Sequence, residues 1–398
     1  MLLHAWRIAF RNLLRHKIFA FINLTGLGIG VACCLLLMLY VQYEMSYDSF
    51  HPEGDQVYRM ALERIYPEHE TFYAIIPHSI GEATQAELPE VEAVCRIMPG
   101  FGTMVLQKED QFFEEDKHLF ADSNFFQIFG IELLSGQPNQ VLKGQNSVVL
   151  TEAAAQRYFG NEDPVGQTIQ ANFGANFGSM QVTGVCENVP AQSHIAFEML
   201  ISLNSMGFIR TTQNYLSFST LTYLKLKEGT DPAHTEAKFP GVIEAYAAGQ
   251  IQRNLGVSFE DYQAAGNGYH YFLQPLQDIH LDSHLEAEIQ PNGNRNYVYL
   301  FLSIALFILL IACINFMNLA TARSAERAKE VGMRKVLGSH RSSLILQFLL
   351  ESIFLAGVSV LLALAIIRFG LPFFNEASGK ALTMEPFTHP LAMLGLLG

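Results

Sequence analysis

Two long stretches without an acidic or basic side chain constrain this chain more than any other feature. The first runs from Ile18 to Tyr43 (26 residues) and the second from Asn296 to Ala322 (27 residues). A helix of 26 residues rises about 39 Å, which exceeds the roughly 30 Å of hydrocarbon in a bilayer. A third stretch, Ser342 to Ile367, is interrupted by one acid, Glu351. The sequence therefore predicts three membrane-spanning helices, at 18–43, 296–322 and 342–367.

Charge is distributed unevenly around these stretches. Residues 1–17 carry four bases and no acid, whereas residues 44–295 carry 33 acids and 13 bases within a chain of net charge -13. Basic flanks of membrane spans lie on the cytoplasmic side, beside anionic lipid. We therefore expect a cytoplasmic N-terminus, with residues 1–17 forming a basic amphipathic helix at the membrane surface. The acidic residues 44–295 are expected on the far side of the membrane, and nothing in the charge pattern favours nucleic acid as a partner.

The first apolar stretch could also be read as a secretory signal. Its apolar part is about twice the usual signal length, and no small-residue cleavage motif precedes Glu44. We interpret it as a retained membrane anchor.

The segment 44–295 is long enough to hold its own core, in two subdomains. Its pattern predicts an α+β domain. Strands are expected at Val57–Arg64, Val94–Met98, Ser147–Leu150, Gln167–Gln170, Met180–Val185, Leu221–Lys227 and Tyr269–Leu281. Helices are expected at Ile80–Leu88 with Ser79 as cap, at 152–159 between Thr151 and Gly160, and at Ala233–Asn254. The tip of a hairpin is expected at Asn172–Gly178.

Two cysteines, Cys95 and Cys186, lie in this outer segment. They could form a disulfide in an oxidising compartment, but both occupy apolar, strand-like contexts in which a buried thiol is the simpler interpretation.

The spans contain a few residues suited to helix packing. Gly26 and Gly30 form a GxxxG pattern, which admits a close helix contact either within the chain or with a second copy. Asn315 and Asn318 lie one turn apart in the second span and require partners other than lipid, either neighbouring helices or a transport path. Glu351, inside the third span, is a candidate functional acid or a partner for a cytoplasmic base.

Acidic and imidazole side chains alternate in Asp278, His280, Asp282 and His284. On a strand they would share one face and could bind zinc or another divalent metal, although any half-exposed strand shows the same alternation.

The segment 323–341 between the second and third stretches is the most densely charged part of the chain, with net charge +4. A helix here would offer charged and small residues to a cytoplasmic partner, although a solvated loop would have the same composition. The candidate docking residues are Arg323, Glu326, Arg327, Lys329, Glu330, Gly332, Arg334, Lys335 and Gly338. The chain contains no GxxxxGK[ST], HExxH or GxSxG motif, so the sequence predicts no ATPase site and no enzyme activity of its own.

The C-terminal part is expected to form an outer loop at 368–389 and the first residues of a fourth span at 390–398. Eight apolar residues after Pro390 cannot cross a bilayer, so we expect the sequence to be a piece of a longer protein.

Several stretches resemble the permease subunits of MacB-like and FtsX-like ABC transporters, above all the long bacterial form common in Bacteroidota, in which a four-span half occurs twice. These stretches are Tyr47–Met60, Phe120–Pro138, Asn146–Ile169, Val182–His194 and Ala312–Gly338.

The resemblance implies a multi-pass inner-membrane protein with a MacB-like periplasmic core domain, made of a porter-like and a β-rich subdomain. It also implies that a separate ABC ATPase docks on residues 323–341 and drives motions that reshape the periplasmic domain. Export of a drug, antimicrobial peptide or lipoprotein would follow, in a dimeric or pseudo-dimeric permease, with a periplasmic adaptor or outer-membrane channel as further partners. No cofactor is implied.

Two other functions remain open from the residues alone. A membrane-anchored sensor or scaffold would bind a ligand through the outer domain, although no cytoplasmic signalling domain is evident. A membrane-anchored metalloenzyme would use His280 and His284.

Overall fold

The computed structural model describes residues 17–138, 140–173, 176–326, 332–333, 336 and 341–388. The chain divides into two compact units. The first combines residues 1–45 with residues 295–398, and the second comprises residues 46–294, which we call the ectodomain. Each unit is described separately below.

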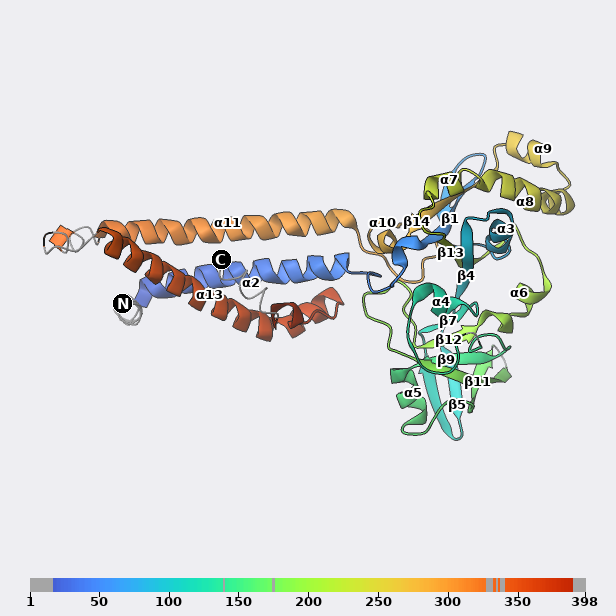
Figure 1. Ribbon diagram of the computed structural model, residues 1–398, viewed down its shortest axis with the longest axis horizontal. Coiled ribbons are helices and arrows are strands. Elements are labelled where there is room, and N and C mark those ends of the chain that lie inside the picture. Colours follow the sequence, from blue (N-terminus) through green and yellow to red (C-terminus); the bar gives the residue numbers. More distant parts are fainter. Residues whose placement is uncertain are drawn as a thin grey trace. The chain divides into compact units, whose positions relative to one another are not determined.

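In its described residues, the first unit contains three long helices, α2 (Lys17–Met45), α11 (Arg295–Glu326) and α13 (Arg341–Ser378), followed by the short 3-10 helix η4 (Glu385–Thr388). Helix α2 packs along both α11 and α13 (Figure 1). Within the described residues, three segments are long and apolar enough to cross a membrane: Ala20–Met45, Arg295–Ala322 and Phe348–Ser378. Helix α13 continues beyond the predicted third span, 342–367, and ends at Ser378.

The ectodomain is organised around one mixed sheet, with the strand order β14-β1-β13-β4-β7-β12-β9-β11-β10-β5-β6. Strands β2, β3 and β8 pair at its margins with β1, β13 and β11. The strands are β1 (Val57–Ile65), β2 (Glu70–Tyr73), β3 (Ile76–Pro77), β4 (Val91–Pro99), β5 (Met104–Lys108), β6 (Gln111–Glu115), β7 (His118–Ala121), β8 (Leu133–Ser135), β9 (Ser147–Thr151), β10 (Thr168–Phe173), β11 (Asn176–Cys186), β12 (Met199–Ser202), β13 (Phe218–Leu226) and β14 (Gly268–Pro275).

Short helices connect these strands. The α-helices are α3 (Ile80–Glu87), α4 (Phe125–Phe129), α5 (Glu152–Phe159), α6 (Gly207–Thr211), α7 (Pro232–Glu236), α8 (Phe239–Leu255), α9 (Phe259–Ala264) and α10 (Ile279–Asp282). The 3-10 helices are η1 (Gly54–Gln56), η2 (Leu203–Ser205) and η3 (Leu276–Asp278).

One end of the sheet forms a βαββαβ unit. Strands β14, β1, β13 and β4 are antiparallel neighbours, and α3 and α8 are the helices of the two crossovers. Strand alternation places Met60 and Leu62 of β1 in the core beneath these helices. Residues 100–217, which include β5 to β12, are inserted between β4 and β13 and form the second subdomain around α5. The fold is therefore the predicted α+β ectodomain with two parts.

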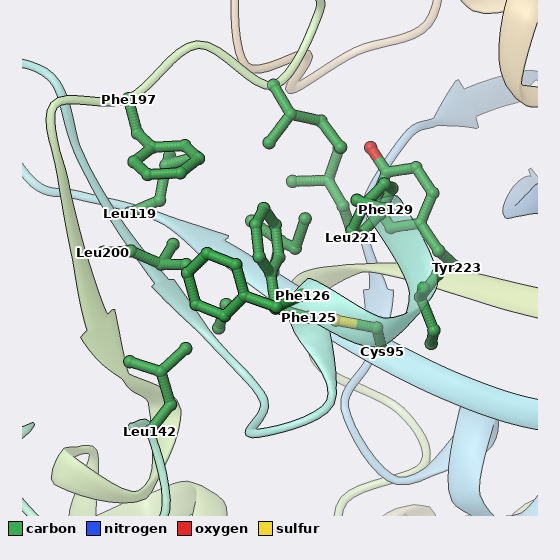
Figure 2. Packing of buried hydrophobic residues seen from close by; sticks show 14 of the residues in the cluster. Cys95, Leu119, Phe125, Phe126, Phe129, Leu142, Phe197, Leu200, Leu221 and Tyr223 are labelled. Carbon is green, nitrogen blue, oxygen red and sulfur yellow. The ribbon is translucent and has the colours of Figure 1, made fainter. Parts of the chain in front are cut away.

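The opposite face of the βαββαβ sheet is covered by α4 and by the segments at the two ends of the ectodomain. Figure 2 shows this core, in which Phe125 and Phe129 of α4 pack near Tyr223 and Leu221 of β13. Cys95 and Cys186 both belong to this core and are free thiols, so the disulfide is not formed. Burial raises the pKa of the Cys186 thiol to about 12 and also raises that of Cys95.

Several local predictions are confirmed. The Thr151 hydroxyl accepts a hydrogen bond from the Ala154 amide (3.3 Å), and Gly160 ends the helix with a positive φ of 59°. Strands β10 and β11 pair as a hairpin.

Other local predictions need correction. Ser79 precedes α3, but its hydroxyl accepts a hydrogen bond from the Asn214 amide (3.0 Å) instead of capping the helix. The segment Ala233–Asn254 is mostly helix, as expected, and it consists of two helices, since Pro240 is suited to the first turn of a new helix, α8. The hairpin strands reach Phe173 and Asn176, so the predicted tip at Asn172–Gly178 is largely strand, in keeping with the short loops that hairpins favour.

Candidate functional site

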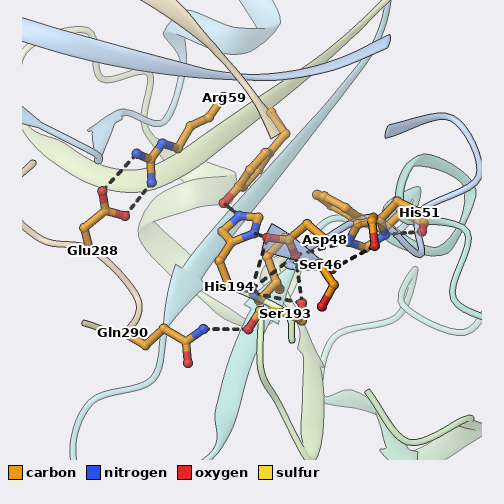
Figure 3. A network of polar contacts seen from close by, with 12 residues as sticks. Ser46, Asp48, His51, Arg59, Ser193, His194, Glu288 and Gln290 are labelled. Atoms are coloured by element: carbon orange, nitrogen blue, oxygen red, sulfur yellow. Dashed lines mark hydrogen bonds and ion pairs between the residues drawn. The ribbon is translucent and has the colours of Figure 1, made fainter. Parts of the chain in front are cut away.

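The ectodomain begins and ends with two segments that are continuous with membrane helices. We call residues 46–56 the N-terminal connector, since they follow α2 directly, and residues 276–294 the C-terminal connector, since they lead directly into α11. The C-terminal connector contributes Leu276 and Ile279 to the core on the face of the βαββαβ sheet opposite α3 and α8. The N-terminal connector leads directly into Val57 of β1, which belongs to the same core. Polar side chains join the two connectors there (Figure 3). We call them the connector network, and its main members are Asp48, His51, Arg59, Ser193, His194, Glu288 and Gln290.

Asp48 is the central acid of the N-terminal connector. It is fully buried and has a left-handed backbone, with φ of 56°. Its carboxylate accepts hydrogen bonds from the Ser193 hydroxyl (3.2 Å) and the His194 amide (3.1 Å). Its own amide donates to the Gln192 carbonyl (2.9 Å). Aspartate tolerates this backbone better than most residues, and the surrounding hydrogen bonds hold it there.

Two imidazoles flank the Asp48 carboxylate. His194 Nδ1 lies 2.8 Å from Asp48 Oδ2, and His194 Nε2 lies 2.9 Å from the Tyr223 hydroxyl. On the other side, His51 Nε2 lies 3.5 Å from Asp48 Oδ1 and His51 Nδ1 lies 2.6 Å from the Phe129 carbonyl oxygen. Burial alone would raise the pKa of Asp48, but the two histidines outweigh it and hold this pKa well below its usual range. Burial also raises the pKa of the Tyr223 hydroxyl.

Arg59 on β1 ties the C-terminal connector to the sheet. Its guanidinium is completely buried and contacts both carboxylate oxygens of Glu288, at 2.5 and 2.9 Å (Figure 3). It also donates to the Gln274 side chain (2.6 and 3.2 Å) and to the Ser283 hydroxyl (2.7 Å). A buried ion pair with additional hydrogen bonds is costly to break, because removing one partner leaves the other charge unpaired.

The two connectors also contact each other, and both bind the loop that contains Ser193. The Tyr47 ring stacks on His280, with 3.3 Å between ring centroids and 2° between ring planes. The Gln290 side chain donates to the Ser193 carbonyl (2.5 Å), next to the residues that bind Asp48. Ala287, which has a positive φ of 63°, lies between two residues that are held in place. The backbone of Glu286 hydrogen-bonds to the backbone of Phe72 and Ala74, and the Glu288 side chain pairs with Arg59.

The predicted metal-binding face is not formed. Strand β14 ends at Pro275, and the following residues are η3 and α10, so Asp278, His280, Asp282 and His284 do not alternate along a strand. A proline cannot donate a ladder hydrogen bond, which is a physical reason for the strand to end there. His280 is buried beneath Tyr47, whereas His284 is exposed. Across the described part of the chain, no group of His, Cys, Asp and Glu side chains is arranged to hold a metal ion.

The glycines of α2 make close contacts within the chain. A Cβ at Gly30 would lie 2.6 Å from the Ala312 Cβ of α11, and one at Gly26 would lie 3.2 Å from the Asn315 side chain. Gly28 faces the other neighbour, since a Cβ there would lie 2.9 Å from Leu362 of α13. The GxxxG surface is therefore occupied by α11 of the same chain.

The polar residues of the spans differ in exposure. Asn315 and Asn318 are exposed on α11, whereas Glu351 is buried on α13. Near the ends of α2 and α13, Lys380 Nζ contacts the buried Glu44 carboxylate at 2.6 Å and lies 5.6 Å from the centre of the Tyr43 ring. This pair joins the two helix ends and was not predicted from the sequence.

The predicted docking segment lies mostly outside the described residues. Arg323 and Glu326 are in the last turns of α11, and Gly332 is helical and exposed. Arg327, Lys329, Glu330, Arg334, Lys335 and Gly338 lie outside the described residues, as do the predicted N-terminal amphipathic helix apart from Lys17 and the predicted start of a fourth span.

Apart from His280, sequence analysis did not single out the residues of the connector network, although Asp48, His51, Arg59, Ser193 and His194 lie in two of the stretches quoted for the family resemblance, YDSFHPEGDQVYRM and VTGVCENVPAQSH. The available signal was Arg59, a charged residue within the otherwise uncharged strand pattern VYRMAL.

Comparison with known proteins identifies two matching family models. Residues 20–242 match the MacB-like periplasmic core domain, and residues 302–398 match the FtsX-like permease C-terminal domain. The Bacillus subtilis (strain 168) protein named uncharacterized ABC transporter permease YvrN is 23% identical, over 89% of this chain and 84% of its own.

Two further likenesses complete the comparison. The macrolide export ATP-binding/permease protein MacB 1/2 of Paracoccus denitrificans (strain Pd 1222) is 23% identical, over 100% of this chain and 54% of its own. The crystal structure of a domain from Porphyromonas gingivalis, described as that of a permease, covers 56% of this chain and 91% of its own, with 22% identity and a TM-score of 0.48.

Proposed function

Because the chain belongs to the family of ABC transporter permeases with a MacB-like periplasmic core domain and an FtsX-like C-terminal domain, we propose that it transmits motion from a cytoplasmic ATPase to its ectodomain. The sequence contains no GxxxxGK[ST] motif, so the ATPase activity would be supplied by a partner. The motion would drive export or efflux of a drug, an antimicrobial peptide or a lipoprotein. One observation supports this proposal above the others: the two connectors lie on the same face of one sheet and are joined there by polar contacts and ring stacking.

The connectors give the proposal a physical basis. The N-terminal connector follows α2 directly and the C-terminal connector leads directly into α11. When either helix moves, the connector network is therefore the first part of the ectodomain to which the chain transmits the movement. The network is rigid, because Asp48 and Arg59 are fully buried and each makes several hydrogen bonds. A displacement applied there would be passed to β1 and β13, and from them to the rest of the sheet, without being absorbed in a flexible linker.

The residues proposed to receive the ATPase are the basic segment 323–341, with Arg323, Arg327, Arg334 and Lys335 as its main charges. The segment would lie in the cytoplasm by the positive-inside rule, with residues 1–17 on the same side. The exposed amides of Asn315 and Asn318 are proposed to meet a second permease copy or half, since amides in a membrane require a partner other than lipid.

The docking role is tested by co-purification of the full-length protein with the ATPase encoded beside it. The variant Arg327→Glu with Arg334→Glu reverses two charges in the segment, and we expect it to lose ATPase binding. A matched control, Arg210→Glu with Arg253→Glu, makes the same change in net charge at two exposed ectodomain positions and should leave binding intact. Equal binding by wild type and the segment variant would show that this segment is not the docking site.

A further inference from the structure

Strand β6 is the last strand at one end of the ectodomain sheet. It pairs with β5 in an antiparallel hairpin, with Phe112 opposite Gln107 and Glu114 opposite Val105. Among the described residues, no second strand pairs with β6, and no backbone group of a turn or loop hydrogen-bonds to Gln111–Glu115. The outer edge of β6 therefore presents unpaired amides and carbonyls, which are a template for a further strand.

The other edges of the sheet are covered or very short. Helix α7 lies against β14, and its Glu236 carboxylate accepts a hydrogen bond from the Leu273 amide (3.0 Å). The backbone of Glu286 hydrogen-bonds to that of Phe72 and Ala74 beside β2 (2.8 and 2.9 Å). Strands β3 and β8 have only two and three residues, whereas β6 has five. No comparable cover reaches β6 from the described part of the chain.

The two faces of β6 differ in what they contact. The Phe113 ring packs 5.0 Å from the Tyr158 ring between centroids, and the buried Glu115 carboxylate accepts a hydrogen bond from the Tyr158 hydroxyl. Strand alternation places Phe112 and Glu114 on the opposite face, where both are exposed and the Phe112 side chain is 62% accessible. An apolar ring is thus available to a side chain on an added strand, as in an ordinary cross-strand pair.

Acidic side chains around β6 set the charge of a suitable partner. Four exposed acids flank Phe112 and form no ion pair with a described residue: Glu109, Asp110, Glu114 and Asp116. The two nearby lysines are already paired, Lys108 with Glu162 (2.8 Å) and Lys117 with Glu198 (3.2 Å). The uncovered edge is therefore negative, and a basic strand complements it.

The same charges argue against a second copy of this edge as the partner. Pairing β6 with β6 of another chain would bring two acidic segments together, and like charges on facing strands are destabilising. A neutral strand would gain the backbone hydrogen bonds but leave the acids without partners. Charge complementarity selects a basic segment, and Phe112 adds the requirement for an apolar side chain.

We propose that β6 binds an extended, basic peptide segment of a partner protein, which joins the sheet as a further strand. The segment places an apolar side chain opposite Phe112, and basic side chains two residues away on either side, toward Asp110 and Glu114. Backbone hydrogen bonds supply the attraction common to all strands, and the side chains supply selectivity. This inference concerns the ectodomain alone and does not depend on the proposed role in transport.

The test is hydrogen exchange of the full chain in nanodiscs of zwitterionic lipid, read by mass spectrometry as a synthetic peptide is added. The probe is the end-capped peptide Lys-Thr-Val-Thr-Lys, which presents Lys, Val and Lys on one face in either strand direction. We expect the amides of residues 109–116 to gain protection several-fold at saturating peptide. The dependence of this protection on peptide concentration gives the apparent Kd.

Two control peptides separate strand addition from simple attraction between charges. Lys-Lys-Thr-Thr-Val has the same composition and charge, but its valine has no lysine two residues away on the same face. It should bind more weakly than the probe. Glu-Thr-Val-Thr-Glu keeps the spacing and reverses the charge, and it should give no protection.

Two variants test the side chains of β6. Phe112→Ser and Glu114→Lys change exposed residues, and each should weaken binding of the probe by about two- to fivefold, as expected for the loss of one cross-strand contact. The matched controls Phe208→Ser on α6 and Glu260→Lys on α9 make the same changes at exposed positions elsewhere and should bind as the wild type does.

The proposal fails if residues 109–116 gain no protection, if the two lysine peptides protect the wild type equally, or if Phe112→Ser and Glu114→Lys bind the probe as the wild type does. If a variant does not fold, the comparison of peptides on the wild type decides the question by itself.

Discussion

Arg59 and Glu288 lie 229 positions apart in the chain and form a two-point ion pair, with both terminal guanidinium nitrogens on the carboxylate. The pair fixes the C-terminal connector to β1, the strand that directly follows the N-terminal connector. It therefore joins the beginning and the end of the ectodomain where these continue into α2 and α11.

We expect Glu288→Ala to destabilise the protein by about 3–5 kcal/mol, because it leaves the Arg59 charge buried without its partner. The double variant Arg59→Met with Glu288→Leu removes both charges, so its free energy of unfolding should fall by much less. Thermal unfolding of the detergent-solubilised chain measures both. Lys117→Met, at an exposed pair with Glu198, serves as the control and should change stability by less than about 1 kcal/mol. A similar small loss for Glu288→Ala would contradict the role given to the buried pair.

Ala287 has a backbone conformation that glycine adopts more readily. With φ of 63°, replacing it by glycine removes a steric cost of about 1 kcal/mol, so Ala287→Gly should be neutral or stabilising by up to that amount. Ala245→Gly, at an exposed position inside α8, should instead destabilise by about 1 kcal/mol. Chemical denaturation of the two variants side by side decides the matter, and equal losses would mean that the conformation at Ala287 carries no strain.

The lowered pKa of Asp48 predicts that the folded protein loses stability as the pH becomes acidic. Its pKa is lower in the folded state than in the unfolded chain, so its stabilising contribution is complete above the ordinary carboxyl value of about 3.9 and is lost as pH falls below it. The variant Asp48→Asn should be less stable than the wild type near neutral pH, and the difference should shrink on acidification. Melting temperatures between about pH 6 and pH 3 provide the measurement. A constant difference across that range would rule out an ionised Asp48 as its source.

Gly30 is predicted to be the most sensitive small residue of α2. In Gly30→Ala the new methyl would lie 2.6 Å from the Ala312 Cβ, so α2 and α11 must separate, at a cost of about 1–3 kcal/mol. Gly26→Ala meets only the flexible Asn315 side chain at 3.2 Å and should cost less. Gly357→Ala on α13 meets no atom within 4 Å and is the matched control. Thermal stability in detergent should therefore fall most for Gly30→Ala, and an unchanged value would mean that the helices do not pack at this glycine.

Much of the architecture could be predicted from local patterns. The three apolar helices, the α+β character of the ectodomain, the cap at Thr151 and the hairpin β10–β11 all depend on residues close together in the chain. Errors arose where a distant group competes for a local signal. Ser79 has the sequence of a helix cap, yet its hydroxyl binds Asn214, and the alternation after Pro275 was mistaken for strand because the packing of His280 on Tyr47 was not visible.

The sequence by itself determined which segments can cross a membrane and which form a separate acidic domain, because hydrophobicity and charge act through the composition of each segment. The tertiary structure alone decided which polar residues meet. Asp48 finds His194 and Arg59 finds Glu288 only after the sheet brings both ends of the ectodomain onto one face. It also placed Ala312 against Gly30, within the same chain. Such partners are set by the geometry of strands and helices far apart in sequence, and no local pattern encodes them.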